Sequence, residues 1–248
     1  MFNINTKWSK VFALGCTHGT HIDKKFKAAA LKARGSWNPD ICVHLGDAID
    51  MEALMSSHVE HGSGEELGPD VQAGLDFLEE LRPTHFLCGN HEDRAWKLQN
   101  HRSQFVRAAA RAGIESIEDT CQEIGTIVVP YTGNQQNLTI GRVRFMHGTV
   151  YNEAAIIHHA TAFAPRKGAV VFVHTHRPGQ ARGKREDHPI GYNVGTGTRR
   201  GALAYAKTNM STLGWGQALL FGVINTKGSF QLWLHEHHDV TQPWMLPV

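Results

Sequence analysis

The chain has 248 residues, of which 41% are hydrophobic, and a formal net charge of +2 at neutral pH. That size can bury a complete hydrophobic core, and we expect one domain over residues 1–248. A charge this small excludes proteins that bind nucleic acids or membranes mainly through a strong overall field. No window approaches the roughly 20 apolar residues of a membrane span, and the first residues lack the apolar core of a signal peptide. We therefore expect a soluble, cytoplasmic protein without a membrane partner.

The cysteines and histidines indicate the compartment and the chemistry. Four cysteines lie far apart without a CxxC pair, which favours a reduced, intracellular setting. Cys42 and Cys88 lie within apolar runs and are interpreted as core residues, as is His44 inside a predicted strand. Seventeen histidines are many for this length, and imidazole is the commonest metal ligand. Composition alone does not tell which of these histidines bind a metal ion.

Predicted strands and helices alternate in the first third of the chain. The apolar runs at 11–15, 41–45 and 84–89 predict strands, each of which reaches a glycine and is followed by polar side chains. The segments 21–34 and 70–83 have the three-to-four spacing of amphipathic helices. In open α/β sheets, ligands bind at the carboxyl ends of the strands. The polar residues after these strands are therefore the candidate site.

The second half of the chain is rich in predicted strands. One helical stretch, 152–164, interrupts them. A mostly parallel first half with a strand-rich second half predicts an α/β fold of two sheets packed face to face, with helices outside. The strand-like runs are 125–131, 137–148, 168–176, 191–196, 216–225 and 228–236.

Side chains that bind metals gather at the predicted strand ends. In extended backbone, residues i and i+2 point the same way, so the pairs Cys16/His18 and His174/His176 are each expected to converge. Thiolate, imidazole, carboxylate and amide oxygen are all metal ligands. Such a set exceeds the needs of one tetrahedral ion and suits two ions that share a carboxylate. The full group is Cys16, His18, Asp47, Asn90, His91, His147, His174 and His176.

Five short motifs occur in order over about two thirds of the chain: GCTH, LGD, GNHED, MHG and VHTH. Together they resemble the calcineurin-like metallophosphoesterase superfamily, whose pattern is D-x-H, G-D, G-N-H-[DE], H and G-H-x-H. The segment 193–224 resembles phage-encoded members more weakly, which suggests a protein encoded by a phage and located in a bacterial host. The resemblance implies a sandwich of two mixed β-sheets flanked by helices.

The resemblance also implies roles for the site residues. Asp47 would be shared between two metal ions, and His91 would protonate the leaving oxygen. The implied reaction is hydrolysis of a phosphate mono- or diester, in a small molecule or a nucleic acid, by attack of a metal-bridging hydroxide. The first ion, Zn, Fe or Mn, would be held by Cys16, His18, Asp47 and His176. The second would be held by Asp47, Asn90, His147 and His174.

Two departures from the family pattern leave alternatives open. Val173 replaces a glycine, which alters packing and removes no ligand. Cys16 stands where the family has aspartate, so it either binds as a thiolate or turns into the core and leaves three protein ligands with water. A degenerate, non-catalytic metal-binding module on the same fold is the alternative function.

Several further residues near the motifs are open between a site role and a structural one. Arg94 would either contact a substrate phosphate or cap a helix. The basic stretch 176–187 would either face a polyanion at the mouth of the site or be solvated. His158 and His159 lie on the predicted helical stretch near the motifs, and neither is predicted as a ligand. Segments 51–70 and 178–216 are predicted to wall the pocket.

Overall fold

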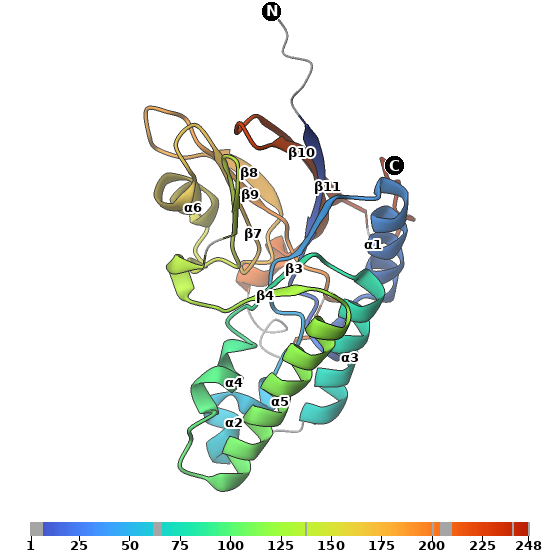
Figure 1. The fold of residues 1–248 in the computed structure, drawn as a ribbon, viewed down its shortest axis with the longest axis vertical. Helices are drawn as coiled ribbons and strands as arrows, with labels where there is room; N and C mark the ends of the chain where they lie inside the picture. The colour runs from blue at the N-terminus through green and yellow to red at the C-terminus, as the bar shows by residue number, and fades with distance from the viewer. Residues whose placement is uncertain are drawn as a thin grey trace, which may run out of the picture.

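A computed structural model of the chain describes residues 7–61, 66–136, 138–199, 201–203, 210–239 and 241–247. Two β-sheets lie face to face, with helices on their outer sides (Figure 1). The six-stranded sheet has the order β11-β10-β1-β2-β3-β4, and the five-stranded sheet has the order β5-β6-β7-β9-β8. Each sheet combines parallel and antiparallel pairs. The predicted α/β sandwich of two mixed sheets flanked by helices is therefore confirmed.

The strands are short, apart from the C-terminal hairpin. The first sheet contains β1 Trp8–Leu14, β2 Ile41–His44, β3 His85–Leu87, β4 Ile127–Val129, β10 Gln217–Asn225 and β11 Phe230–His237. The second contains β5 Leu138–Ile140, β6 Val143–Phe145, β7 Ala169–Phe172, β8 Gly179–Arg182 and β9 Ile190–Asn193.

The described helices are α1 Lys24–Trp37, α2 Ser56–His61, α3 Leu67–Leu81, α4 Asp93–Leu98, α5 Gln104–Glu123 and α6 Ala155–Phe163. Short 3₁₀ helices span Gly19–His21, Glu52–Leu54, Gly133–Gln135 and Met210–Gly214. None of the described helices is both long and apolar enough to cross a lipid bilayer.

Strand β1 shows how the sheet separates two cores. Val11 and Ala13 face the core between the sheets, whereas Phe12 and Leu14 face a second core under the helices α1 and α3. All four side chains are fully buried. Burial of a side chain such as valine or phenylalanine stabilises the fold by roughly 1.5–3 kcal/mol. A strand buried on both faces reads as a continuous apolar run, which is why the sequence predicts it.

Helix α1 begins later than the sequence predicts because of its cap. The Asp23 carboxylate accepts hydrogen bonds from the backbone N–H groups of Lys25 (2.8 Å) and Phe26 (2.9 Å). Asp23 is thus the N-cap, and the residues before it form the 3₁₀ turn. The helix ends at Asn38, which adopts the left-handed conformation common after helices.

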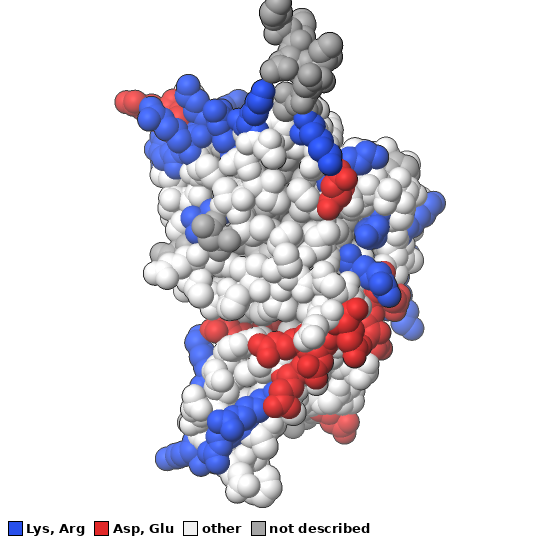
Figure 2. All heavy atoms as spheres, in the orientation of Figure 1, with Lys and Arg blue, Asp and Glu red and all other residues white. Residues whose placement is uncertain are grey.

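Helices α4 and α5 follow the third strand, where the sequence predicts a helix without defined bounds. In α5, only a narrow stripe that includes Ile114, Ile117 and Cys121 is buried. The C-terminal half of α5 also carries Glu115 and Glu118, and acidic side chains form a band over the region of α5 and α3 (Figure 2). Acidic residues in the last turns oppose the helix dipole, so packing of the stripe, rather than local charge, keeps this helix folded.

Candidate metal centre

The candidate ligands lie on loops that leave neighbouring strands of both sheets. Loop 16–19 pairs with loop 46–48: the N–H of Cys16 bonds the Gly46 carbonyl (2.8 Å), and the N–H of His18 bonds the Asp47 carbonyl (2.9 Å). Asn90 follows β3, and the remaining ligands follow strands of the second sheet. The face-to-face packing of the sheets brings these loops to one place. The ligands from the second sheet are His147 after β6 and His174 and His176 after β7.

The ligand pairs converge for a different reason from the one the sequence suggests. Cys16, His18, His174 and His176 are not in extended strands; all four have positive φ, between 51° and 63°. Asp47 has the same conformation, with φ 51°. Non-glycine residues seldom adopt this region, and each costs about 1–3 kcal/mol unless its surroundings hold it. The prediction of convergence was right, but strained loops rather than pleated strands produce it.

The first group of candidate ligands contains Cys16, His18, Asp47 and His176. One ligand atom from each lies within 4.8 Å of the others, and all four residues are buried. The Nε2 atoms of His18 and His176 are 3.2 Å apart. Asp47 Oδ2 lies 3.8 Å from His18 Nε2 and 3.9 Å from Cys16 Sγ. The structure therefore brings together the four residues predicted for one ion.

The second group surrounds the imidazole of His147. Its Nε2 lies 3.2 Å from Asp47 Oδ2, 3.0 Å from Asn90 Oδ1 and 3.3 Å from His174 Nδ1. The same carboxylate oxygen of Asp47 thus borders both groups. All the residues predicted for the second ion lie together.

The hydrogen bonds of His147 test whether a cation fits this group. Its Nδ1 lies 2.9 Å from the Leu45 carbonyl, an acceptor only, so in the neutral ring Nδ1 carries the proton and Nε2 is bare. That bare nitrogen faces the oxygens of Asp47 and Asn90. Facing lone pairs repel one another, and a cation among them relieves this repulsion. The residues therefore fit a metal ion.

The other imidazoles are in the protonation state that binds metal. Burial lowers the pKa of His174 to about 3, and burial also lowers the pKa of His18. Burial holds the pKa of His176 well below its ordinary value, and its Nδ1 has no hydrogen-bond partner among the described residues. Neutral imidazole is the form that coordinates metals, so no proton has to be displaced from these rings.

Cys16 has features of both of its predicted roles. Burial and then the negative charge of Asp47 raise the pKa of its thiol well above the ordinary value, so without a metal the sulfur stays protonated. Its side chain also packs with the core between the sheets. Yet its Sγ lies within the first ligand group. A bound cation would instead favour the thiolate form of Cys16, because metal coordination deprotonates a thiol.

His91 lies beside the two groups and is oriented by Asp50, a residue the sequence analysis missed. His91 Nδ1 lies 2.6 Å from the Asp50 carbonyl and 2.9 Å from its Oδ1, while Nε2 is 3.9 Å from Asp47 Oδ2. Asp50 Oδ1 also accepts from His18 Nδ1 at 2.6 Å. Burial would raise the pKa of Asp50, but hydrogen bonds from the two histidines hold it well below its usual range. The only sequence signal for Asp50 is its place three residues after Asp47.

Glu92 and Gln136 hold the loops in place, and neither was predicted. Buried Glu92 accepts from the N–H groups of Asp47 (3.0 Å), Ile49 (2.9 Å) and Gly89 (2.7 Å). Its pKa is raised to about 7 by burial and then by Asp47. Gly89 must be glycine, because a Cβ there would collide with the Asp47 carboxylate. The glutamate is part of the GNHED motif, which could have indicated its role.

Gln136 links the ligand loops of the two sheets. Its Nε2 donates to the Cys88 carbonyl (2.8 Å), and its Oε1 accepts from the N–H of His147 (2.8 Å). Cys88 lies two residues before ligand Asn90, so Gln136 fixes two ligands of the second group relative to each other. No pattern in the sequence points to this glutamine.

Arg94 and His159 support the site from outside the ligand groups. Arg94 donates to the carbonyls of Asp50 (2.8 Å) and Met51 (3.2 Å), and its Nη2 is 3.3 Å from His91 Nε2. It neither caps a helix nor lines the mouth. His159 accepts from the N–H of Thr149 (3.0 Å) and so anchors the loop after His147. His44 is buried and lies 3.2 Å from a threonine hydroxyl, as expected of a core histidine.

The mouth of the site differs from the predicted one. A pocket of about 270 Å³ opens over the candidate ligands, and none of the described residues of segment 51–70, which are 51–61 and 66–70, lines it. Of the basic stretch 176–187, the candidate ligand His176 and its neighbour Arg177 line the pocket, and the rest turns away as β8, where Arg185 pairs with Asp187 at 2.7 Å. The residues around the mouth beyond the ligands are Tyr151, Thr175, Arg177, Thr212 and Trp215.

Two stacked mixed sheets with histidine, aspartate and cysteine ligands at their loop ends define a metal-binding α/β sandwich. A family model described as calcineurin-like phosphoesterase matches residues 9–196, more than half of the chain. The chain therefore belongs to the calcineurin-like phosphoesterase family.

Individual relatives are distant. A solved structure of YfcE, a phosphoesterase from E. coli, matches 90% of this chain and 98% of that chain, at 15% identity and a TM-score of 0.41. At that identity and score the likeness carries no inference about function. No curated protein matches the chain significantly.

Proposed function

We propose that the protein is a dinuclear metal-dependent phosphoesterase that hydrolyses phosphate mono- or diesters. One observation carries this proposal: Asp47 Oδ2 lies within 3.9 Å of ligand atoms from both groups. A shared carboxylate is what a two-metal site requires. The proposed ions are Zn, Fe or Mn. One would be held by Cys16, His18, Asp47 and His176, and the other by Asp47, Asn90, His147 and His174.

Bound there, two cations would clamp phosphate oxygens and lower the pKa of a water molecule that serves as nucleophile. The chain's own residues divide the remaining work. Asp50 holds Nδ1 of His91, so that Nε2 points toward the ligand groups. His91 would give its Nε2 proton to the leaving oxygen. Glu92 and Gln136 keep the ligand loops in register.

Hydrolysis of p-nitrophenyl phosphate and of bis-p-nitrophenyl phosphate, across Zn, Fe, Mn, Ni and Mg, tests this function. We expect turnover of at least one ester with at least one metal, and loss of turnover on chelation. The ratio of the two rates tells monoesterase from diesterase. Metal bound at two equivalents without turnover of either ester would contradict the proposal and support a non-catalytic metal-binding module.

The second ion should depend on both His147 and His174. In His147→Ala and His174→Ala, elemental analysis should find close to one bound ion in place of two, because each variant removes a ligand that no neighbour replaces. The exposed His158, on α6, supplies the control His158→Ala, which should keep both ions. Two ions retained in both ligand variants would rule out this assignment.

Cys16 should bind the first ion as a thiolate. A zinc–sulfur bond of about 2.3 Å exceeds a zinc–oxygen bond of about 2.0–2.2 Å, which partly compensates for the shorter side chain. We therefore expect Cys16→Ala to weaken that ion, and Cys16→Asp to stay active while preferring manganese, a harder metal.

Thiol labelling read by peptide mass spectrometry provides the direct test. Cys16 should be shielded when metal is bound and labelled after chelation, whereas buried Cys42, on the outer side of the sheet, serves as the internal reference. Equal labelling of Cys16 in both states, together with full metal content in Cys16→Ala, would show that this thiol belongs to the core alone.

A further inference from the structure

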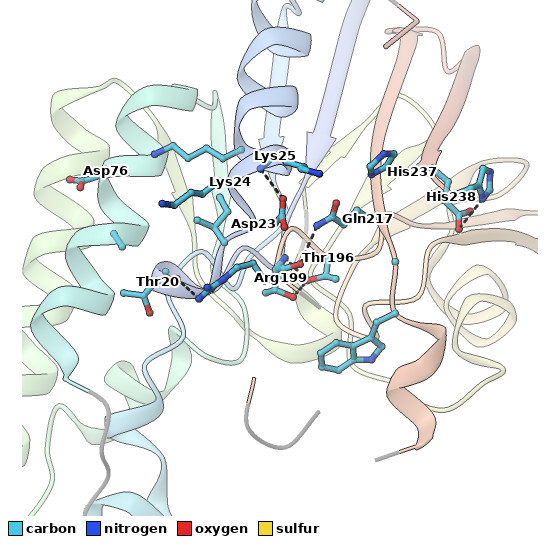
Figure 3. Close-up of a pocket in the computed structure, with 18 of the residues that line it drawn as sticks. Thr20, Asp23, Lys24, Lys25, Asp76, Thr196, Arg199, Gln217, His237 and His238 are labelled. Atoms are coloured by element: carbon cyan, nitrogen blue, oxygen red, sulfur yellow. Dashed lines mark hydrogen bonds and ion pairs between the residues drawn. The ribbon is translucent and has the colours of Figure 1, made fainter. Parts of the chain in front are cut away.

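A second, larger cavity adjoins the metal centre. Its volume is about 1100 Å³, and it lies between α1, α3, the loop 196–199 and the ends of β10 and β11 (Figure 3). None of the residues assigned to metal binding or proton transfer lines it. The proposed function therefore leaves this cavity without a role.

The cavity and the mouth of the metal centre share one wall. Trp215 lines both, and its ring centroid is 4.3 Å from that of ligand His176. Gly19 and Thr20, which follow ligand His18 directly, line the cavity as well. A substrate with its phosphate at the metals could therefore continue past Trp215 into the cavity without a break.

Three basic side chains of the cavity have no ion-pair partner among the described residues. Lys24, Lys25 and Arg199 are exposed there, and Figure 3 shows the two lysines at the start of α1 and Arg199 reaching toward Thr20. Among the described residues none of the three side chains forms an ion pair; the Arg199 guanidinium donates to the Thr20 carbonyl at 3.4 Å.

The acidic side chains of the cavity are already engaged. The Asp23 carboxylate caps α1, the Asp76 carboxylate accepts from Gln72 at 2.6 Å, and Glu236 lies 3.7 Å from His238. These contacts leave the carboxylates charged, so the lining has a small excess of cations beside a wall formed by an indole: Lys24, Lys25, Lys27 and Arg199 against Asp23, Asp76 and Glu236. Tyr151, 78% exposed, adds a second aromatic ring at the mouth.

We propose that this cavity binds the part of a single-stranded oligonucleotide next to the scissile phosphate. A neighbouring phosphate would lie between Lys24, Lys25 and Arg199, and a base would stack on Trp215. Cationic grooves with aromatic platforms bind single-stranded nucleic acids because every nucleotide carries a charged phosphate and a planar base that can stack on an aromatic ring. A phosphopeptide supplies charges without regularly spaced flat rings, so the aromatic walls favour the oligonucleotide. The proposal rests on the proposed function only for the position of the scissile phosphate.

The test compares the double variant Lys24→Ala/Lys25→Ala with Lys32→Ala, an exposed lysine of the same helix that does not line the cavity. For a short oligothymidylate, the double variant should lose more than about tenfold in kcat/KM, and the slope of log affinity against log salt should fall by about 0.7 per lost phosphate contact. Hydrolysis of bis-p-nitrophenyl phosphate, which is too small to reach the lysines, should change by less than about twofold.

Binding of a fluorescent oligothymidylate, measured by anisotropy in the presence of chelator, separates this proposal from the proposed function. If no ester is hydrolysed but the double variant still weakens binding, the proposed function fails and the cavity assignment holds. Equal losses in the double variant and in Lys32→Ala, or no loss in either, would overturn the cavity assignment. A lysine-dependent preference for a phosphopeptide over the oligothymidylate would overturn it as well.

Discussion

Asp47→Asn is expected to lose metal and turnover together, with a decrease in turnover of more than about 10³-fold. The carboxylate offers one oxygen, Oδ2, to both ligand groups, and a neutral amide cannot share a lone pair and a negative charge between two cations. Loss of several kcal/mol of charge stabilisation corresponds to a decrease of this size, because each 1.36 kcal/mol is about tenfold in rate. Elemental analysis and ester hydrolysis measure the two effects.

The fold should survive this substitution. Asp47 Oδ1 accepts from the N–H of His91 at 3.0 Å, and an asparagine carbonyl can keep that bond. Exposed Asp119 on α5 supplies the control Asp119→Asn, which should retain metal and turnover. A variant of Asp47 that binds two ions with unchanged affinity would show that this carboxylate is not shared.

The sequence could indicate which residues gather at the candidate site, because their chemistry and their place at strand ends are both local. Apolar runs such as 11–14 are recognisable, and a glycine followed by Cys16 and His18 is an unusual way to leave a buried strand. The left-handed backbone that aims these two side chains could not be predicted. That conformation is imposed by hydrogen bonds from loop 16–19 to loop 46–48, which lies about thirty residues further along the chain.

Residues that position the ligands were mostly missed. Asp50 gains its role only when His18 and His91, from different strands, meet at its carboxylate. Gln136 gains its role only when the two sheets stack, because it bonds a carbonyl of one sheet's loop and an N–H of the other's. Such long-range pairings leave no periodic pattern in a single sequence. The bounds of helix α5 were not predicted for a related reason, since only its narrow buried stripe is fixed by tertiary packing.

His91→Ala is expected to keep both metal ions and to lose turnover by about 10² to 10⁴-fold, the usual contribution of a general acid. Its Nδ1 is bound to the Asp50 carbonyl, and its Nε2 lies 3.9 Å from Asp47 Oδ2. His91 clusters with His18 and Asp50 but belongs to neither of the two groups proposed to hold the ions, so its removal leaves both complete. The loss should be small for p-nitrophenyl esters and large for alkyl esters, because only a poor leaving group needs the proton. The exposed His158 again supplies the control, His158→Ala.

The pH dependence tests the same role through the charge on His91. Burial lowers the pKa of His91, but the charge of Asp47 and the hydrogen bond that His91 donates to Asp50 outweigh it and raise the pKa to about 9. Below that value the ring carries the proton that an acid must give, so wild-type turnover of alkyl esters should fall as pH rises through it. Bound cations offset the charge of Asp47, which places the inflection of the metal-loaded enzyme below 9. His91→Ala should lack this alkaline limb; a variant that kept the limb, or that lost its metal, would show that His91 is not the acid.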